Sequence, residues 1–280
     1  MKRVPIILLL SGVFAAGMFL ACNKKKDYPV DIAPAQAHFN NNSIGSYYIK
    51  NDPNSTFKIP VGVTNLSNSS RNITVTVTTT TGATSAQYSV PSTTVTIPAG
   101  KAVDSITVKG LFSGYAVARI DTLVFTITGG DVTPSDYNKT FKLVLRKYCD
   151  VVLSNFLGVY ANSYDDDGGG PYGPYTTTVT AVNQLTPSTG TITIANASDA
   201  WMGVPPNPIV VGLDWTDPAN FKTTIAAQII YSGNFYGYGA LTITGVGTGT
   251  FSSCDNTIKL NYKMTVGAGS FGGVNTVMAR

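Results

Sequence analysis

Residues 72–78 read Asn72-Ile73-Thr74-Val75-Thr76-Val77-Thr78, so polar and apolar side chains alternate without interruption. Successive side chains of a β-strand point to opposite faces, which puts Ile73, Val75 and Val77 on one face. We therefore predict a strand that is buried on one side and solvated on the other. Similar patterns mark further predicted strands at residues 57–63, 94–97, 105–108, 121–128 and 141–145.

The composition of the chain points to the same fold class. Among its 280 residues are 15 acidic ones, all of them Asp, and Thr occurs 36 times. Glu favours helices, whereas Thr, Val, Ile and Tyr favour strands. Charged residues make up 12% of the chain, about half the usual share, and hydrophobic residues 43%. This composition predicts an all-β protein, and it excludes a helical bundle and catalysis by paired Glu side chains.

The spacing of the strands predicts two β-domains. Over residues 38–147, turn signals recur at intervals of about eight to fifteen residues, as in an Ig-like β-sandwich. A second set of short, turn-bounded strands covers residues 148–280. It predicts another antiparallel β-domain, either a sandwich or a small β-barrel.

The N-terminal residues are predicted to direct export rather than to fold. Met1–Ala21 has a short basic start and then an apolar run that stops at Cys22, which is typical of a secretory signal. The stretch Phe19-Leu20-Ala21-Cys22 resembles a bacterial lipobox. This resemblance implies cleavage before Cys22 and a diacylglycerol on its thiol, with residues 22–37 as a tether. A membrane-spanning helix is the alternative for the apolar run.

The charge pattern argues against nucleic acid as a partner. The formal net charge is +4, but two positive charges belong to the predicted signal, and Lys24, Lys25 and Lys26 follow directly after it. No basic stripe is present in the predicted β-domains. We expect the lysine triplet to lie near anionic lipid headgroups.

The cysteines fit an exported protein. With Cys22 lipidated, Cys149 and Cys254 remain, and an even remainder predicts a disulfide between them. Two separately buried thiols are the alternative. The sequence has no CxxC motif and no Cys/His spacing that suits zinc, so we predict no metal site.

Part of the chain resembles a known domain family. The residues that carry the likeness are Phe57–Val63, Ile73–Val77, Tyr88, Val95-Thr96-Ile97-Pro98-Ala99-Gly100 and Asp121–Ile127. Their order is similar to that of the Calx-β/Ig-like N-terminal domain of Bacteroidota surface lipoproteins, over about residues 36–147. Calx-β modules bind calcium through clustered carboxylates, whereas the Asp residues here are scattered, so we carry no calcium site over. The second half is similar to lipocalin-like modules of such lipoproteins.

Few side chains suit catalysis. His38 is the single histidine, and no nucleophile elbow, phosphate-binding loop or dinucleotide motif is present. Asp165, Asp166 and Asp167 form the densest acidic group, in a Gly-rich loop. We expect a solvated loop there, with a bound cation or an acid–base pair as alternatives. The prediction is that the protein is not an enzyme and uses no catalytic residue and no cofactor.

Aromatic residues outside the alternating runs are the clearest binding signal. Tyr172, Tyr175, Trp201, Tyr236 and Tyr238 lie among Gly, Pro and Asn. An aromatic ring stacks on the apolar face of a sugar, while Asp, Asn and Gln bind its hydroxyls. We predict that at least two of these rings form one exposed platform. The alternative is that they pack in the core and in rigid turns.

Together these features predict a non-catalytic outer-membrane lipoprotein that resembles those of the polysaccharide-utilisation type and binds glycans through its C-terminal domain. The lipid would hold it on the periplasmic or the cell-surface face, beside outer-membrane transporter components. Two alternatives remain. One is a structural or adhesive envelope protein that binds protein partners, and the other is a lipocalin-like binder of a small ligand.

Overall fold

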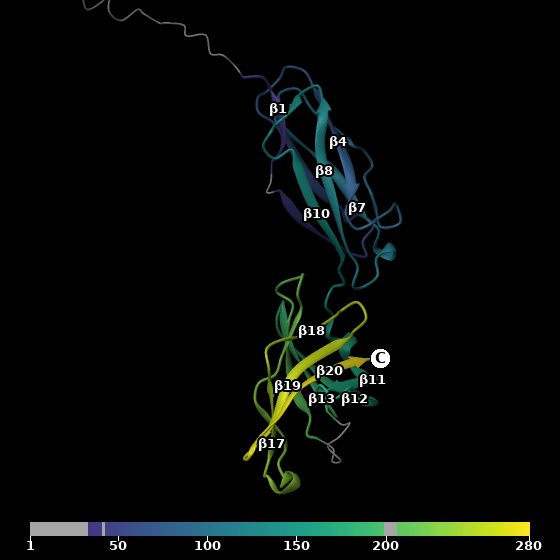
Figure 1. Ribbon diagram of the computed structural model, residues 1–280. Coiled ribbons are helices and arrows are strands. Elements are labelled where there is room, and N and C mark those ends of the chain that lie inside the picture. Colours follow the sequence, from purple (N-terminus) through teal and green to yellow (C-terminus); the bar gives the residue numbers. More distant parts are fainter. Residues whose placement is uncertain (1–32, 41–42, 199–205) are drawn as a thin grey trace, which may run out of the picture. The chain divides into compact units, whose positions relative to one another are not determined.

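The computed structural model describes residues 33–40, 43–198 and 206–280. Their regular structure is almost entirely β-strand (Figure 1), and the described helices are three short 3₁₀ turns: η1 (Phe112–Gly114), η2 (Leu153–Phe156) and η3 (Phe235–Gly237). The predicted all-β fold is confirmed. None of the described helices has the length and apolarity needed to cross a membrane. The predicted signal, Cys22 and most of the tether lie outside the described residues.

The strands of the first half form two sheets, as expected for a sandwich. One sheet has the order β5-β7-β3-β1-β9 and the other the order β2-β10-β8-β4-β6. The pairs β1–β9 and β2–β10 are parallel, and the other pairs are antiparallel. The bounds are β1 (Gln36–Phe39), β2 (Ile44–Ile49), β3 (Phe57–Val63), β4 (Arg71–Thr79), β5 (Tyr88–Ser89), β6 (Thr94–Ile97), β7 (Val103–Gly110), β8 (Ile120–Gly130), β9 (Thr133–Pro134) and β10 (Thr140–Lys147).

Alternation along these strands builds the core of the sandwich. Ile73 and Val75 of β4 are buried, while the Thr residues beside them are exposed. Leu123 of β8 is buried in the same way. Rings from the two sheets meet inside, because Phe39 of β1 and Phe141 of β10 have centroids 5.8 Å apart. The inward faces predicted from the sequence are confirmed at these positions.

The strands of the second half form one sheet that closes on itself. Its order is β16-β17-β19-β18-β15-β14-β13-β12-β11-β20, and an additional pairing joins β19 to β20. This pairing closes a ring of eight strands, β11-β12-β13-β14-β15-β18-β19-β20, which is a barrel rather than a sandwich. The bounds are β11 (Gly158–Asp166), β12 (Pro171–Thr186), β13 (Thr189–Ala195), β14 (Ile209–Asp214), β15 (Lys222–Thr224), β16 (Gln228–Tyr231), β17 (Leu241–Gly245), β18 (Gly249–Phe251), β19 (Ile258–Val266) and β20 (Gly269–Ala279).

The interior of this barrel is filled by side chains. Leu260, Tyr262 and Met264 of β19 have no exposed surface, and the same holds for Ile194 of β13 and Val211 of β14. A cavity wide enough for water would leave exposed surface on the side chains that line it. These five side chains therefore border no such cavity. The lipocalin-like alternative predicts a deep apolar cavity in this interior, and these five side chains do not border one.

A disulfide fastens the end of the barrel at which the chain enters. Cys149 precedes η2, and its partner Cys254 lies between β18 and β19, with the two Cα atoms 5.2 Å apart. The predicted pairing is confirmed. The bond spans 105 positions of sequence, and chain-entropy models assign a stabilisation of about 4–5 kcal/mol to a loop of that length.

Candidate functional site

The meander of the barrel brings four connections to one end, which we call the loop end. They are residues 167–170, 232–240 and 267–268, and the connection between β13 and β14, of which residues 196–198 and 206–208 are described. Alternate connections of an up-and-down barrel share an end, so residues that are distant in sequence converge there. The disulfide lies at the opposite end, with η2 and the connection between β18 and β19.

The connection between β16 and β17 is a compact loop that presents two tyrosines. The backbone N–H of Phe235 donates to the carbonyl of Gly239 at 2.9 Å, and the N–H of Tyr238 donates to the carbonyl of Phe235 at 2.9 Å. The N–H of Gly239 donates to Oδ1 of Asn234 at 2.8 Å. Phe235 is buried, whereas Tyr236 is 70% exposed and Tyr238 is 55% exposed. The backbone and Phe235 thus anchor the loop and leave both phenol rings outside.

A third aromatic side chain joins these two. The ring of Phe271, on β20, lies 5.9 Å from that of Phe235, and the ring of Tyr236 lies 4.6 Å from Phe235, both edge-on. Phe271 is 43% exposed. We call Tyr236, Tyr238 and Phe271 the aromatic platform. A shallow depression of about 230 Å³ beside it is lined by Tyr238, Val266, Ala268, Gly269, Ser270 and Phe271.

Tyr175 has a different environment, although the sequence groups it with the other loop aromatics. Its hydroxyl lies 2.6 Å from Oδ1 of Asp165, to which it donates a hydrogen bond. Thr276 donates to the same oxygen at 2.5 Å, and Ser198 donates to Oδ2 at 3.2 Å. Burial, together with the neighbouring charge of Asp165, raises the pKa of Tyr175. The hydroxyl of Tyr175 is thus engaged inside the barrel and stays protonated.

Tyr172 lies on β12, close to the turn that joins β11 to β12, and is 40% exposed. In that turn, Oδ1 of Asp166 accepts the N–H of Gly168 at 2.8 Å, and Oδ1 of Asp167 accepts the N–H of Gly169 at 2.9 Å. These contacts fit the solvated loop that we expect. In the described ranges, no group of three or more His, Cys, Asp or Glu residues is placed to hold a metal ion.

The structure therefore brings together only part of the predicted set. Tyr236 and Tyr238 share one loop. Phe271, which is not among the predicted site residues, lies against Phe235 of that loop and lines the depression together with Tyr238. Tyr172 and Tyr175 lie on β12 beside the acidic turn. Trp201 lies outside the described residues.

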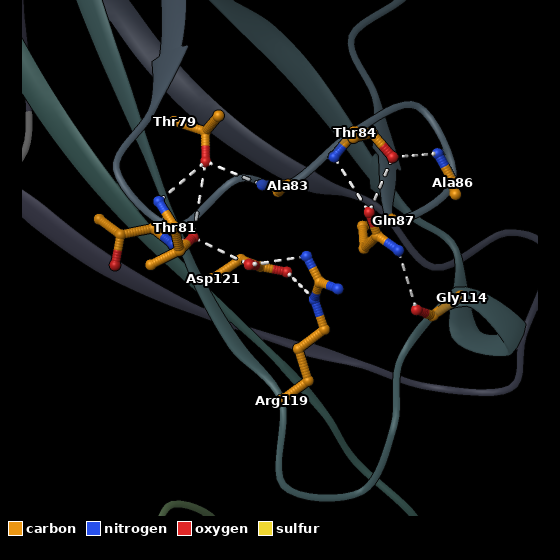
Figure 2. A network of polar contacts seen from close by, with 10 residues as sticks. Thr79, Thr81, Ala83, Thr84, Ala86, Gln87, Gly114, Arg119 and Asp121 are labelled. Carbon is orange, nitrogen blue, oxygen red and sulfur yellow. Dashed lines mark hydrogen bonds and ion pairs between the residues drawn. The ribbon is translucent and has the colours of Figure 1, made fainter.

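A second polar cluster occurs in the sandwich (Figure 2). Nε of Arg119 donates to Oδ2 of Asp121 at 2.8 Å, and Oγ1 of Thr81 donates to Oδ1 of Asp121 at 2.8 Å. Nearby, Nε2 of Gln87 donates to the carbonyl of Gly114 at 3.2 Å. Asp121 is 1% exposed. The contacts tie the loop after β4 to the segment that leads into β8.

The pKa of Asp121 reflects this environment. Burial by itself would raise it, but the hydrogen bonds from Arg119 and Thr81 outweigh burial and hold the pKa below its usual value. The groups of this cluster bind one another, so we assign it a structural role and place the candidate site at the loop end of the barrel.

Comparison with known proteins yields likenesses of structure alone. No protein-family model matches the chain, and no curated protein matches it. Solved structures that are similar to it include proteins of Bacteroides and a Calx domain. What the fold and the site define is an all-β protein with an exposed aromatic platform on a closed barrel.

Three of these structures illustrate how distant the likeness is. A Bacteroides ovatus protein that is provisionally described as carbohydrate-binding is 12% identical, with 85% of this chain and 69% of that chain covered and a TM-score of 0.35. A two-domain Bacteroides fragilis protein of unknown function is 10% identical, with 89% of each chain covered and a TM-score of 0.35. The apo form of a Calx CBD1 domain is 8% identical over 41% of this chain and 97% of its own, with a TM-score of 0.34. Values this low carry no argument about function.

Proposed function

We propose that the chain is a non-catalytic, glycan-binding lipoprotein of the bacterial cell envelope and that the aromatic platform is its binding site. One observation carries the proposal: the exposed rings of Tyr236 and Phe271 both lie against buried Phe235, and Phe271 lines a depression at the loop end together with exposed Tyr238. Exposed apolar groups that cluster in this way mark interaction sites on protein surfaces.

The chemistry of the site suits a sugar. A pyranose ring has an apolar face of C–H groups, which an aromatic ring covers, and a rim of hydroxyls. Ser270 lines the depression, and its hydroxyl donates to the carbonyl of Met264 and accepts the N–H of Gly272, which leaves one lone pair that can accept from such a rim. Tyrosine also supplies contact area at a low cost in conformational entropy, because it has few rotatable bonds.

The placement of the carboxylates near the loop end supports binding of a glycan rather than its hydrolysis. Glycoside hydrolysis needs two carboxyl groups about 5–10 Å apart that face the sugar. Asp166 and Asp167 accept N–H groups of their own turn, and Asp165 is buried with hydroxyl donors around it. None of these three lines the depression beside the aromatic platform.

The cellular setting of the proposal rests on the sequence. The signal and the lipobox-like Cys22 support a lipid anchor in the outer membrane, on its periplasmic or cell-surface face. There the barrel would hold glycans for neighbouring transporter components. Single sites of this kind are weak, and many copies on one membrane would supply avidity.

Affinity electrophoresis of the full chain tests the proposal. The gels contain soluble neutral polysaccharides, namely glucans, mannans and xylans, and one gel without polysaccharide serves as the reference. Two variants are compared, Tyr236→Ala/Tyr238→Ala on the platform and Tyr137→Ala in the sandwich. Tyr137 is the matched control because it is an exposed tyrosine, at 84%, outside the barrel.

We expect at least one polysaccharide to slow the unmodified chain and the Tyr137→Ala variant equally. The platform variant should run as it does in the gel without polysaccharide. The proposal fails if no polysaccharide slows the unmodified chain, or if the platform variant is slowed as much as the control.

A second candidate function is adhesion to a protein partner, and one observation favours it. Strand β2 (Ile44–Ile49) forms an edge of its sheet, and Ile44 on it is 58% exposed. An unpaired edge can accept a strand from another chain. This candidate would be favoured if the unmodified chain pulled down an envelope protein and bound no polysaccharide, and if the Ile44→Lys variant no longer pulled that protein down.

A further inference from the structure

The backbone at Tyr236 adopts a conformation that its side chain disfavours. Four non-glycine residues in the described ranges have positive φ, and three of them are Asn: Asn138, Asn196 and Asn256. Asn tolerates the left-handed region because its short side chain can bond locally, whereas a bulky residue there is a real outlier. The fourth residue is Tyr236, with φ 47° and ψ 29°.

Few contacts of the Tyr236 side chain stabilise this conformation. The side chain of Tyr236 is 70% exposed, and its described ring contact is the edge-on one to Phe235. The hydrogen bonds that close the loop run between the backbone of Phe235, Tyr238 and Gly239 and the side chain of Asn234. Glycine would adopt the same backbone without a steric penalty and would keep all of these bonds. A tyrosine that folding does not require points to a role in binding.

The depression lined by Tyr238 and Phe271 of the aromatic platform narrows the class of ligand. Its lining consists of Tyr238, Val266, Ala268, Gly269, Ser270 and Phe271, and none of these side chains carries a charge. A uronic acid or a sulfated sugar would gain no ionic contact from these side chains. A neutral sugar needs only a stacking surface and hydroxyl or backbone partners.

We infer that Tyr236 is a ligand-binding contact of the aromatic platform and that the ligand is an uncharged saccharide bound through the face of a pyranose ring. This inference rests on the proposed function and adds to it a residue that binds the ligand and the charge of that ligand. The left-handed backbone sets the direction in which the side chain of Tyr236 leaves the loop.

Isothermal titration calorimetry and thermal unfolding of the full chain test the inference with two variants. Tyr236→Gly removes the ring but suits the backbone, and Tyr236→Phe keeps the ring. The probes are a neutral oligosaccharide cut from the polysaccharide that slows the chain in electrophoresis, and an oligogalacturonate of similar length. We expect Tyr236→Gly to lose about tenfold or more in affinity, a loss typical of an aromatic contact, with a melting temperature unchanged or raised.

The same measurements show how each claim would fail. We expect Tyr236→Phe to retain affinity to within about threefold, because the stacking face is intact. A lowered melting temperature for Tyr236→Gly, or an unchanged affinity, would overturn the role of Tyr236 while leaving glycan binding in place. Equal binding of oligogalacturonate would overturn the neutral class. A wild-type chain that binds no saccharide but binds phosphatidylcholine vesicles would overturn both this inference and the proposed function.

Discussion

The two β-units use aromatic side chains in opposite ways. In the sandwich they mostly pack inside or against one another, as Phe39 does with Phe141, and Tyr137 is the only largely exposed aromatic among its described residues. In the barrel, Tyr236, Tyr238 and Phe271 are exposed at one end, although the interior holds several more rings. The difference teaches that strand alternation builds both units, whereas only the barrel gathers exposed rings at one end.

The largest expected effect comes from removing the disulfide, which we expect to stabilise the barrel and not the sandwich. In a Cys149→Ser/Cys254→Ser chain we expect the free energy of unfolding of the barrel to fall by about 4–5 kcal/mol. Both tryptophans of the chain, Trp201 and Trp215, belong to the second half, so tryptophan fluorescence during urea unfolding follows the barrel.

Tyrosine fluorescence and far-UV circular dichroism also report the sandwich, which should retain its own transition in the same experiment. If the tryptophan midpoint of the double variant matched that of the unmodified chain, the disulfide would contribute nothing to the barrel. A shift of the sandwich transition by the same amount would show that the two units unfold as one.

A somewhat smaller effect is expected from matched core truncations in the two units. Leu143 of β10 and Leu260 of β19 are both fully buried, one in the sandwich and one in the barrel. Each Leu→Ala change should cost about 2–5 kcal/mol through lost burial and a residual cavity. Tryptophan fluorescence should register Leu260→Ala and not Leu143→Ala, and the reverse pattern would contradict the assignment of the two cores.

The smallest effect concerns acid stability of the sandwich. Because the folded pKa of Asp121 is lowered, its contribution to stability is present above the unfolded pKa of about 4 and is lost as the pH falls through the folded pKa. Arg119→Gln removes the main hydrogen-bond donor to Asp121, so the acid transition of the sandwich should begin at a higher pH. Circular dichroism between pH 2 and pH 6 checks this, and an unchanged midpoint would contradict it.

Much of the fold could be predicted from the sequence, because strands with one buried face carry a period of two. That pattern identified the inward residues Ile73, Leu123 and Phe141, and the cysteine count predicted the bond between Cys149 and Cys254. The closure of the barrel could not be predicted. It depends on β20 pairing with β11 and on β18 pairing with β15, and local alternation does not encode such long-range pairing.

The site could be predicted only in part, for two physical reasons. A register shift between Tyr160 and Ser163 interrupts the alternation of β11. Taking every second residue from buried Tyr160 therefore misses Asp165, which is the buried one of three consecutive acidic residues. Phe271 stands in a Gly-rich hairpin that offers no alternation. The composition of the loop around Tyr236 and Tyr238 did signal exposed rings, whereas the inward turn of the Tyr175 hydroxyl follows from its contact with Asp165.

Hydrogen–deuterium exchange of the full chain, with and without a saturating neutral oligosaccharide, is the most direct test of the claim that the loop end of the barrel binds the ligand. The account predicts slower amide exchange confined to residues 232–240 and 266–273, which hold the aromatic platform and the depression. Protection confined to strands β1–β10 of the sandwich, with no change at the loop end, would contradict it.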